Sequence, residues 1–195
     1  MTLRIVSAQQ RSVKRWVYPS MVKRVQVIKN FYDDEVKNKL NLWTYRNYKN
    51  NFKFRPTHNN PPNTSYTTRW TESNLDFPEE AFNLRQQIID VLNLTNYSFR
   101  YEHGIINTVC FPGCQVWEHL DKAKIKDHII YHCNIIPKKA TGGETVIEGI
   151  EYDIQENDLL CYAVSECLHK VNLIEDTMRF AWMFSFYIPR IELEV

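Results

Sequence analysis

The sequence lacks three features that mark common classes of protein. Its five cysteines are an odd number and form no Cys-x-x-Cys pair, so they are predicted to be small core residues in a reducing compartment, not a disulfide framework. No apolar run approaches the roughly 18 residues that span a bilayer, so no membrane contact is predicted. The first residues contain no apolar segment of the signal-peptide kind. We therefore expect a cytoplasmic protein.

The chain also has little net charge. Its formal charge is +1, which argues against a strongly steered polyanion binder. The charge is unevenly spread, however, because residues 1–32 carry lysines and arginines and no acid, whereas the stretch 101–195 is rich in acids. A basic N-terminal segment next to an acidic region could bind a nucleic acid or an acidic partner. The alternative is that the basic residues of 1–32 lie on a solvent-exposed strand and arm and bind no partner.

The first half of the chain has the pattern of one strand, two helices and a long irregular segment. The apolar run Val25–Ile28 predicts a strand. Acidic first turns predict helices over residues 33–45 and 78–94. Between them, the stretch 47–71 is rich in proline, asparagine and threonine, which favours a loop. A loop of this length is usually functional, and we expect a cover over a cleft.

The second half has the pattern of an all-β domain. Gly, Pro, Asn or Asp separates most of its short β-rich runs, which cover residues 97–101, 105–111, 116–119, 129–136, 145–148, 159–164, 169–174 and 179–188. About eight closely spaced strands predict a β-sandwich or jelly roll with the two helices outside one sheet. The run 180–187 is nearly all apolar, which is typical of a strand that is buried on both faces.

Three residues form a candidate metal site. His119 and Asp121 are two positions apart, so in an extended strand both side chains project to the same face. His169 begins a later strand. Two histidines and one carboxylate on one face of a metal form the facial triad of non-haem iron(II) oxygenases, which leaves three metal positions open. A closed four-ligand zinc site would not supply this openness.

The triad pattern has alternatives. A His-x-Asp motif alone is weak evidence, although His119 is the only histidine here that an acid follows two residues later. His119 and Asp121 could be an ordinary polar pair on a strand, and His169 could be a core histidine. Another pair, His128 and His132, shares a strand face but has no evident third ligand, so we interpret it as surface or sheet residues.

The order of motifs over residues 25–187 resembles that of the prolyl 4-hydroxylase-like branch of the iron(II)- and 2-oxoglutarate-dependent oxygenases. The resemblance is strong over the last ninety residues and loose before them. The matching segments are Phe31-Tyr32-Asp33-Asp34-Glu35, Phe111-Pro112-Gly113, His119-Leu120-Asp121, Ile129-Ile130-Tyr131, Gly142-Gly143-Glu144-Thr145, Gln155-Glu156-Asn157-Asp158-Leu159-Leu160, Leu168-His169-Lys170-Val171 and Thr177-Met178-Arg179-Phe180.

The resemblance implies one mainly β domain, a double-stranded β-helix (jelly roll) with flanking helices. In that arrangement, residues 1–24 are a basic arm, 25–96 the helical support and loop, and 97–190 the β-helix core of a domain that covers 1–195. It also implies a dioxygenase that hydroxylates a C–H bond with Fe(II), 2-oxoglutarate and O2, with ascorbate as one option for a reductant. His119, Asp121 and His169 would bind the iron.

Arg179 would anchor the 2-oxoglutarate, and Arg can grip a carboxylate bidentately where prolyl hydroxylases commonly use Lys. Its alternative role is to pair with an acid. Many relatives carry a co-substrate-binding tyrosine near the positions of Cys110 and Phe111. Tyr131 is predicted to point inward, either adding a hydroxyl to the 2-oxoglutarate pocket or filling the core.

The substrate cannot be derived from the residues. A peptidyl substrate of the prolyl type is favoured by analogy with the prolyl 4-hydroxylase-like branch. A nucleobase or nucleic acid is the second choice, because of the basic arm and the aromatic, arginine-containing loop. A small molecule is the third choice of substrate. The alternative to an enzyme is a non-catalytic binding protein that has the same fold. Monomer and homodimer are both open.

Overall fold

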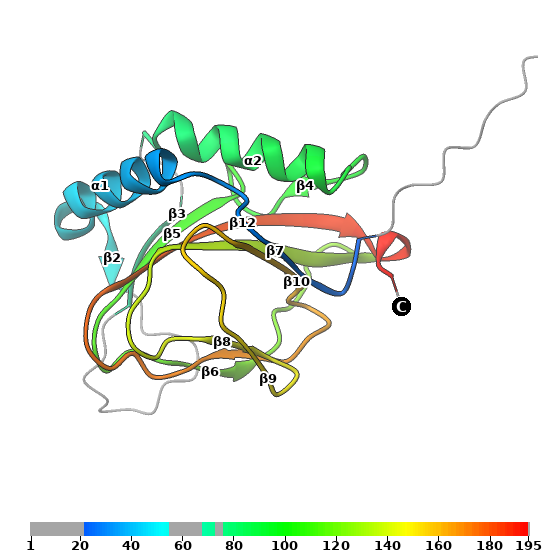
Figure 1. Cartoon of the computed structure of the whole chain (residues 1–195). Helices are drawn as coiled ribbons and strands as arrows, with labels where there is room; N and C mark the ends of the chain where they lie inside the picture. Colours follow the sequence, from blue (N-terminus) through cyan, green and yellow to red (C-terminus); the bar gives the residue numbers. More distant parts are fainter. Residues whose placement is uncertain (1–21, 55–67, 73–75, 195) are drawn as a thin grey trace, which may run out of the picture.

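The computed structural model describes residues 22–54, 68–72 and 76–194, which form two facing antiparallel sheets and two helices on the outside of the larger one (Figure 1). The larger sheet has the strand order β1-β10-β7-β12-β5-β3-β2, and β4 also pairs with β12. The smaller sheet has the order β6-β11-β8-β9. Two sheets that face each other in this way form a jelly roll, as the sequence predicts.

Most of the strands are short. Those of the larger sheet are β1 (Val25–Ile28), β2 (Lys53–Phe54), β3 (Thr68–Glu72), β4 (Ser98–Phe99), β5 (Ile105–Cys110), β7 (His128–Lys138), β10 (Leu159–Ala163) and β12 (Arg179–Pro189). Those of the smaller sheet are β6 (Val116–His119), β8 (Thr145–Ile147), β9 (Ile150–Tyr152) and β11 (His169–Val171). A 3-10 turn, Arg190–Glu192, follows β12.

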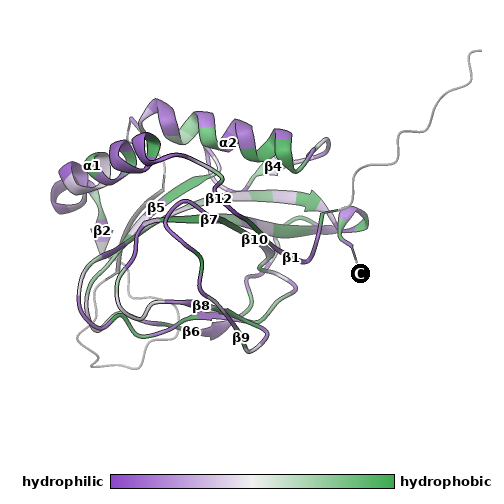
Figure 2. Cartoon of the chain, viewed as in Figure 1, coloured by the Kyte–Doolittle hydropathy of each residue, from purple (hydrophilic) through white to green (hydrophobic). Residues whose placement is uncertain are grey.

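The helices α1 (Asp34–Asn51) and α2 (Glu79–Val91) cover the outer face of the larger sheet (Figure 1). Asp33 caps α1 by accepting a hydrogen bond from the Val36 amide at 2.9 Å. The Trp43 ring of α1 packs on Trp182 of β12 at a centroid distance of 5.3 Å. The helices carry their hydrophilic residues mainly on the solvent side, whereas the central strands are largely hydrophobic (Figure 2). The helices therefore bury the outer face of this sheet.

The two faces of the larger sheet differ in chemistry. In β12, Trp182, Phe184 and Phe186 alternate along the outer face and are fully buried. The inner face, which looks toward the smaller sheet, carries a set of buried polar side chains that we call the inner polar row: His132, Asn134, Tyr162, Arg179 and Ser185. The outer face thus supplies the core, and the inner face supplies polar groups. The prediction that 180–187 is buried on both faces is confirmed.

The segment 47–71, predicted to be irregular, has regular structure at both ends. Helix α1 continues to Asn51, and β2 and β3 pair with each other while β3 also pairs with β5. The loop prediction is wrong for these residues, because β3 obtains its hydrogen bonds from β5, a strand distant in sequence, and local composition does not report such pairing. Residues 55–67, on which the expected cover falls, lie outside the described residues.

The hairpin β8–β9 was also not predicted. It turns at Glu148 and Gly149, both of which have positive φ, +51° and +76°.

Over the described ranges, neither helix is long and apolar enough to cross a membrane.

Candidate metal centre

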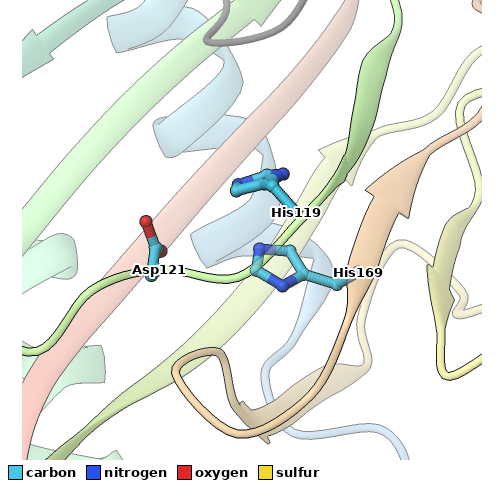
Figure 3. A group of neighbouring side chains, drawn as sticks. All are labelled: His119, Asp121 and His169. Carbon is cyan, nitrogen blue, oxygen red and sulfur yellow. The ribbon is translucent and has the colours of Figure 1, made fainter.

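The two candidate histidine ligands form a cross-strand pair in the smaller sheet. His119 ends β6 and His169 begins β11, and the antiparallel register places the two residues directly opposite each other. Their ring centroids are 4.3 Å apart. Figure 3 shows both rings converging with the Asp121 carboxylate. A ligand atom from each of these three residues lies within 4.8 Å of the other two, so the triad forms one potential metal site.

Hydrogen bonds to the backbone fix the tautomer of each ligand histidine. Nδ1 of His119 donates to the Trp117 carbonyl at 2.7 Å, and Nδ1 of His169 donates to the Cys167 carbonyl at 3.0 Å. A carbonyl oxygen only accepts, so the proton is on Nδ1 in both rings and each Nε2 keeps its lone pair. Burial lowers the pKa of His169, which favours the neutral ring that a metal requires.

Arg100 binds the third member of the triad. Its guanidinium donates to both Asp121 oxygens, at 3.0 Å and 3.3 Å. Burial alone would raise the pKa of Asp121, but the hydrogen bonds and the positive charge of Arg100 lower it below the ordinary carboxyl value. Asp121 is further held by its amide, which donates to the Val164 carbonyl at 3.1 Å. The carboxylate is therefore charged and fixed in place at neutral pH.

His132 and Tyr162 line the inner face beside the triad. The His132 Nε2 is 3.1 Å from Nη1 of Arg100, and burial lowers the His132 pKa to about 3, so this ring is neutral. The Tyr162 ring packs on His169 with a centroid distance of 5.3 Å. Burial raises the pKa of Tyr162, so its phenol keeps the proton. Both residues belong to the inner polar row.

Arg179 is a buried cation without a partner in the described part of the chain. It begins β12 and is 6% exposed, and its side chain forms no hydrogen bond or ion pair with the described residues. Burial lowers its pKa, yet a guanidinium stays protonated in proteins. Its side chain borders a pocket that Ile136, Gly143 and Glu144 also line. A buried charge of this kind calls for an anion.

Gly143 makes room for the Arg179 side chain. A Cβ at Gly143 would lie 2.9 Å from Arg179 Cδ, and the backbone here has a φ of +75°. The Gly142-Gly143 segment therefore does more than make a turn, because only glycine allows the backbone to approach the guanidinium stem so closely.

Tyr131 does not reach the site. Its hydroxyl donates to the Lys23 carbonyl at 2.8 Å and accepts from the Gln26 amide at 3.2 Å. It neighbours His132 on β7, and alternation along the strand places the two side chains on opposite faces. The prediction that Tyr131 adds a hydroxyl to the co-substrate pocket is therefore wrong, and its alternative role in the core fits the fully buried ring.

Sequence reasoning missed Arg100 and Tyr162, and it interpreted His132 as a surface or sheet residue, whereas His132 is buried in the sheet beside the triad. A signal for His132 was present, because His132 and Asn134 are polar residues two positions apart in an otherwise apolar strand. Tyr162 lies within the apolar strand β10. The period of two marks one polar face on a buried strand. Arg100 carried no such signal, since it follows the two-residue strand β4.

No protein-family model and no curated protein sequence matches the chain. Solved structures do match it. The viral collagen prolyl hydroxylase from Paramecium bursaria Chlorella virus 1, in a 2-oxoglutarate complex, has a TM-score of 0.65 at 13% identity, over 84% of this chain and 96% of that one.

Two further structures share the arrangement. A Trichoplax adhaerens prolyl hydroxylase, in complex with a hypoxia inducible factor oxygen degradation domain peptide fragment, has a TM-score of 0.60 at 16% identity, over 87% of this chain and 85% of that one. HygX from Streptomyces hygroscopicus, with nickel and 2-oxoglutarate bound, has a TM-score of 0.61 at 8% identity, over 85% and 83%. The chain has the double-stranded β-helix fold of the 2-oxoglutarate oxygenases, prolyl hydroxylases among them.

Proposed function

We propose that this protein is an iron(II)- and 2-oxoglutarate-dependent oxygenase that hydroxylates a C–H bond of a peptidyl substrate. The observation that carries the proposal is the convergence of the triad in a fold whose inner face also holds the buried Arg179, whose side chain has no partner among the described residues. The donor set of two imidazoles and one carboxylate suits iron(II) and leaves positions for further ligands. When bound, iron, 2-oxoglutarate and O2 supply the oxidising power for hydroxylation, with succinate and CO2 as by-products.

Arg179 fits the role of co-substrate anchor. A dicarboxylate that reaches the triad at one end would bring its other carboxylate as the missing counter-ion of this guanidinium. Arg can hold that group through two parallel hydrogen bonds. Glu144 lies close enough to raise the Arg179 pKa but forms no ion pair with it, so the guanidinium is available to a ligand.

Arg100 prepares the triad for the metal. Without a cation, the Asp121 carboxylate would be a poorly solvated charge, and the guanidinium stabilises it and sets its orientation. The neutral His132 can hydrogen-bond with Arg100 without repelling it. In this role Arg100 is a positioning residue, because it acts through Asp121.

A peptidyl substrate is supported by the Trichoplax adhaerens structure, which was solved with a peptide fragment bound. The nucleic-acid alternative rests on the cations of the basic arm and the loop. Of these, Arg24 donates to the Glu166 carbonyl at 2.6 Å and lies 3.6 Å from the Glu148 carboxylate, so its charge is used within the chain. Others lie outside the described side chains, namely Arg11, Lys14, Arg15, Arg55 and Arg69.

The first prediction concerns the metal. His119→Ala and Asp121→Ala should each abolish Fe(II) binding, because two ligands cannot hold the ion as three do, while the far-UV circular dichroism stays unchanged. Anaerobic titration with Fe(II), and Mn(II) titration followed by paramagnetic resonance, would measure this. The control is His128→Ala, a histidine at the start of β7 that lies outside the triad. Wild-type affinity in either ligand variant would contradict the site.

The second prediction concerns Arg179. Arg179→Ala should weaken 2-oxoglutarate binding by roughly 30-fold or more, because it removes a buried charge partner of the co-substrate. Mn(II) affinity should change little. Arg179→Lys is the matched control, since it keeps the charge and should lose less. Calorimetric titration of the Mn(II)-loaded protein measures these affinities, and equal 2-oxoglutarate affinity in all three proteins would disprove the anchor.

The third prediction concerns the Arg100–Asp121 pair in metal-free protein. Arg100→Met should destabilise it by about 3 kcal/mol at pH 7, because the variant leaves a poorly solvated carboxylate without its partner. The folded-state pKa of Asp121 is lowered, so its contribution is present above the ordinary carboxyl pKa of about 3.9 and is lost as the pH falls further. Urea unfolding in chelator should therefore show a smaller difference in acid than at pH 7. A pH-independent difference would argue against the ion pair.

The fourth prediction concerns the substrate. Proline-containing peptides should stimulate succinate release from 2-oxoglutarate, and single-stranded oligonucleotides should bind weakly or not at all across a salt series. Phosphate contacts lose strength steeply with salt, so tight, salt-sensitive oligonucleotide binding with no peptide stimulation would replace the peptidyl substrate by a nucleic acid. The Asp121→Ala protein is the control for metal-independent background.

A further inference from the structure

The short connection between β10 and β11 contacts two of the three triad residues. Residues 164–168, which we call the 164–168 turn, join β10 of the larger sheet to β11 of the smaller one. The Val164 carbonyl accepts a hydrogen bond from the Asp121 amide at 3.1 Å. The Cys167 carbonyl accepts one from Nδ1 of His169 at 3.0 Å. A displacement of this turn would therefore reorient two metal ligands together.

Hydrogen bonds to the two neighbouring strands fix the beginning of the turn. The Ala163 carbonyl, at the end of β10, accepts from the amides of Glu166 and Cys167, both at 2.9 Å. The Ser165 hydroxyl accepts from the Ile130 amide of β7, also at 2.9 Å. The larger sheet thus holds the turn on the side of β10 and β7.

Arg24, which directly precedes β1, holds the end of the turn that leads to His169. Its Nε donates to the Cys167 Sγ at 3.2 Å, and its Nη2 donates to the Glu166 carbonyl at 2.6 Å. Nη2 also lies 3.6 Å from Oε1 of Glu148, and the same oxygen accepts from the Leu168 amide at 2.6 Å. A planar guanidinium presents these donors in fixed directions, which an ammonium group does not.

The backbone of Arg24 is itself fixed. Its carbonyl accepts from the Ala163 amide at 3.0 Å, next to the pair Val25 and Tyr162 in the register of β1 and β10. The side chain is 52% exposed, so its ion pair with Glu148 adds little to the free energy of folding. The importance of these contacts therefore lies in the position of the turn more than in stability.

We propose that Arg24 is a positioning residue for the metal centre. It holds the 164–168 turn, and through the Cys167 carbonyl it fixes the Nδ1–H tautomer and the orientation of His169. This inference rests on the proposed function. Groups that orient a metal ligand from behind affect metal affinity strongly. The other ligand histidine, His119, bonds to the Trp117 carbonyl of its own strand and is independent of this turn.

The first readout is the tautomer of His169 in the metal-free protein, measured by nitrogen-15 NMR at about pH 8, above the ordinary histidine pKa of about 6.5. The wild type should show the Nδ1–H form. Arg24→Met should show a mixture of both tautomers, because the Cys167 carbonyl is no longer held in place. Arg24→Lys should lie between them, since it keeps the charge but not the planar fork. The His119 tautomer should stay unchanged and is the internal control.

The matched control variant is Arg190→Met. Arg190 is also a half-exposed arginine next to the turn, with 59% of its side chain exposed. It donates to the two carboxylate oxygens of Glu166, at 2.7 Å and 2.8 Å, and not to a backbone carbonyl of the turn. Arg190→Met should therefore keep the wild-type tautomer of His169, although it removes a surface ion pair.

The second readout is Mn(II) affinity, followed by paramagnetic resonance. Arg24→Met should bind Mn(II) roughly tenfold more weakly, at the lower end of the effects of groups that orient metal ligands. Arg190→Met should bind it as the wild type does. Urea unfolding of each metal-free variant shows whether the loss of affinity exceeds any loss of stability.

The outcomes separate this inference from the proposed function. If the wild type binds neither Mn(II) nor Fe(II), the proposed function fails, whatever the tautomers are. If the wild type binds Mn(II) and Arg24→Met binds it equally well, only the role of Arg24 fails. An equal loss of Mn(II) affinity in Arg24→Met and Arg190→Met, with unchanged tautomers, would also overturn that role, because it would reflect general destabilisation.

Discussion

The candidate site depends on the antiparallel register between β6 and β11. That register sets His119 directly opposite His169, and a shift by one residue would turn one of the two rings to the other face of the sheet. The backbone carbonyls that fix the two histidine tautomers lie two residues before each ring, at Trp117 and Cys167. Asp121 needs no separate strand, because it follows His119 by two residues. One strand pair and one short extension thus bring three ligands together.

The two faces of the larger sheet have different roles: the outer face stabilises the fold, and the inner face carries the polar groups of the candidate site. The outer face buries aromatic side chains of β12 under α1 and α2, and burial of such rings supplies most of the favourable free energy of folding. The inner polar row costs free energy of folding, since it buries the Arg179 charge and the Asn134 Oδ1 and Ser185 Oγ atoms, which have no hydrogen-bond partner within the described ranges. A fold tolerates such groups only where the rest of the core compensates, and they are typical of sites that await a polar ligand.

The matching structures share the arrangement of the two sheets at 8–16% identity, so the fold is carried by the alternation of apolar and polar residues more than by particular side chains.

The sequence by itself determined the jelly roll, the helices on one side of it, and the triad with Arg179 ten residues after His169. These features depend on local period, on spacing and on an order of motifs, all of which can be read along the chain. Only the tertiary structure decided the rest: the pairing of β3 with β5, the orientation of Tyr131 toward the outer face, the ion pair between Arg100 and Asp121, and the position of Tyr162 beside His169. Each of these depends on partners distant in sequence, and the direction of a side chain on a buried strand follows from which face meets the smaller sheet, which composition does not encode.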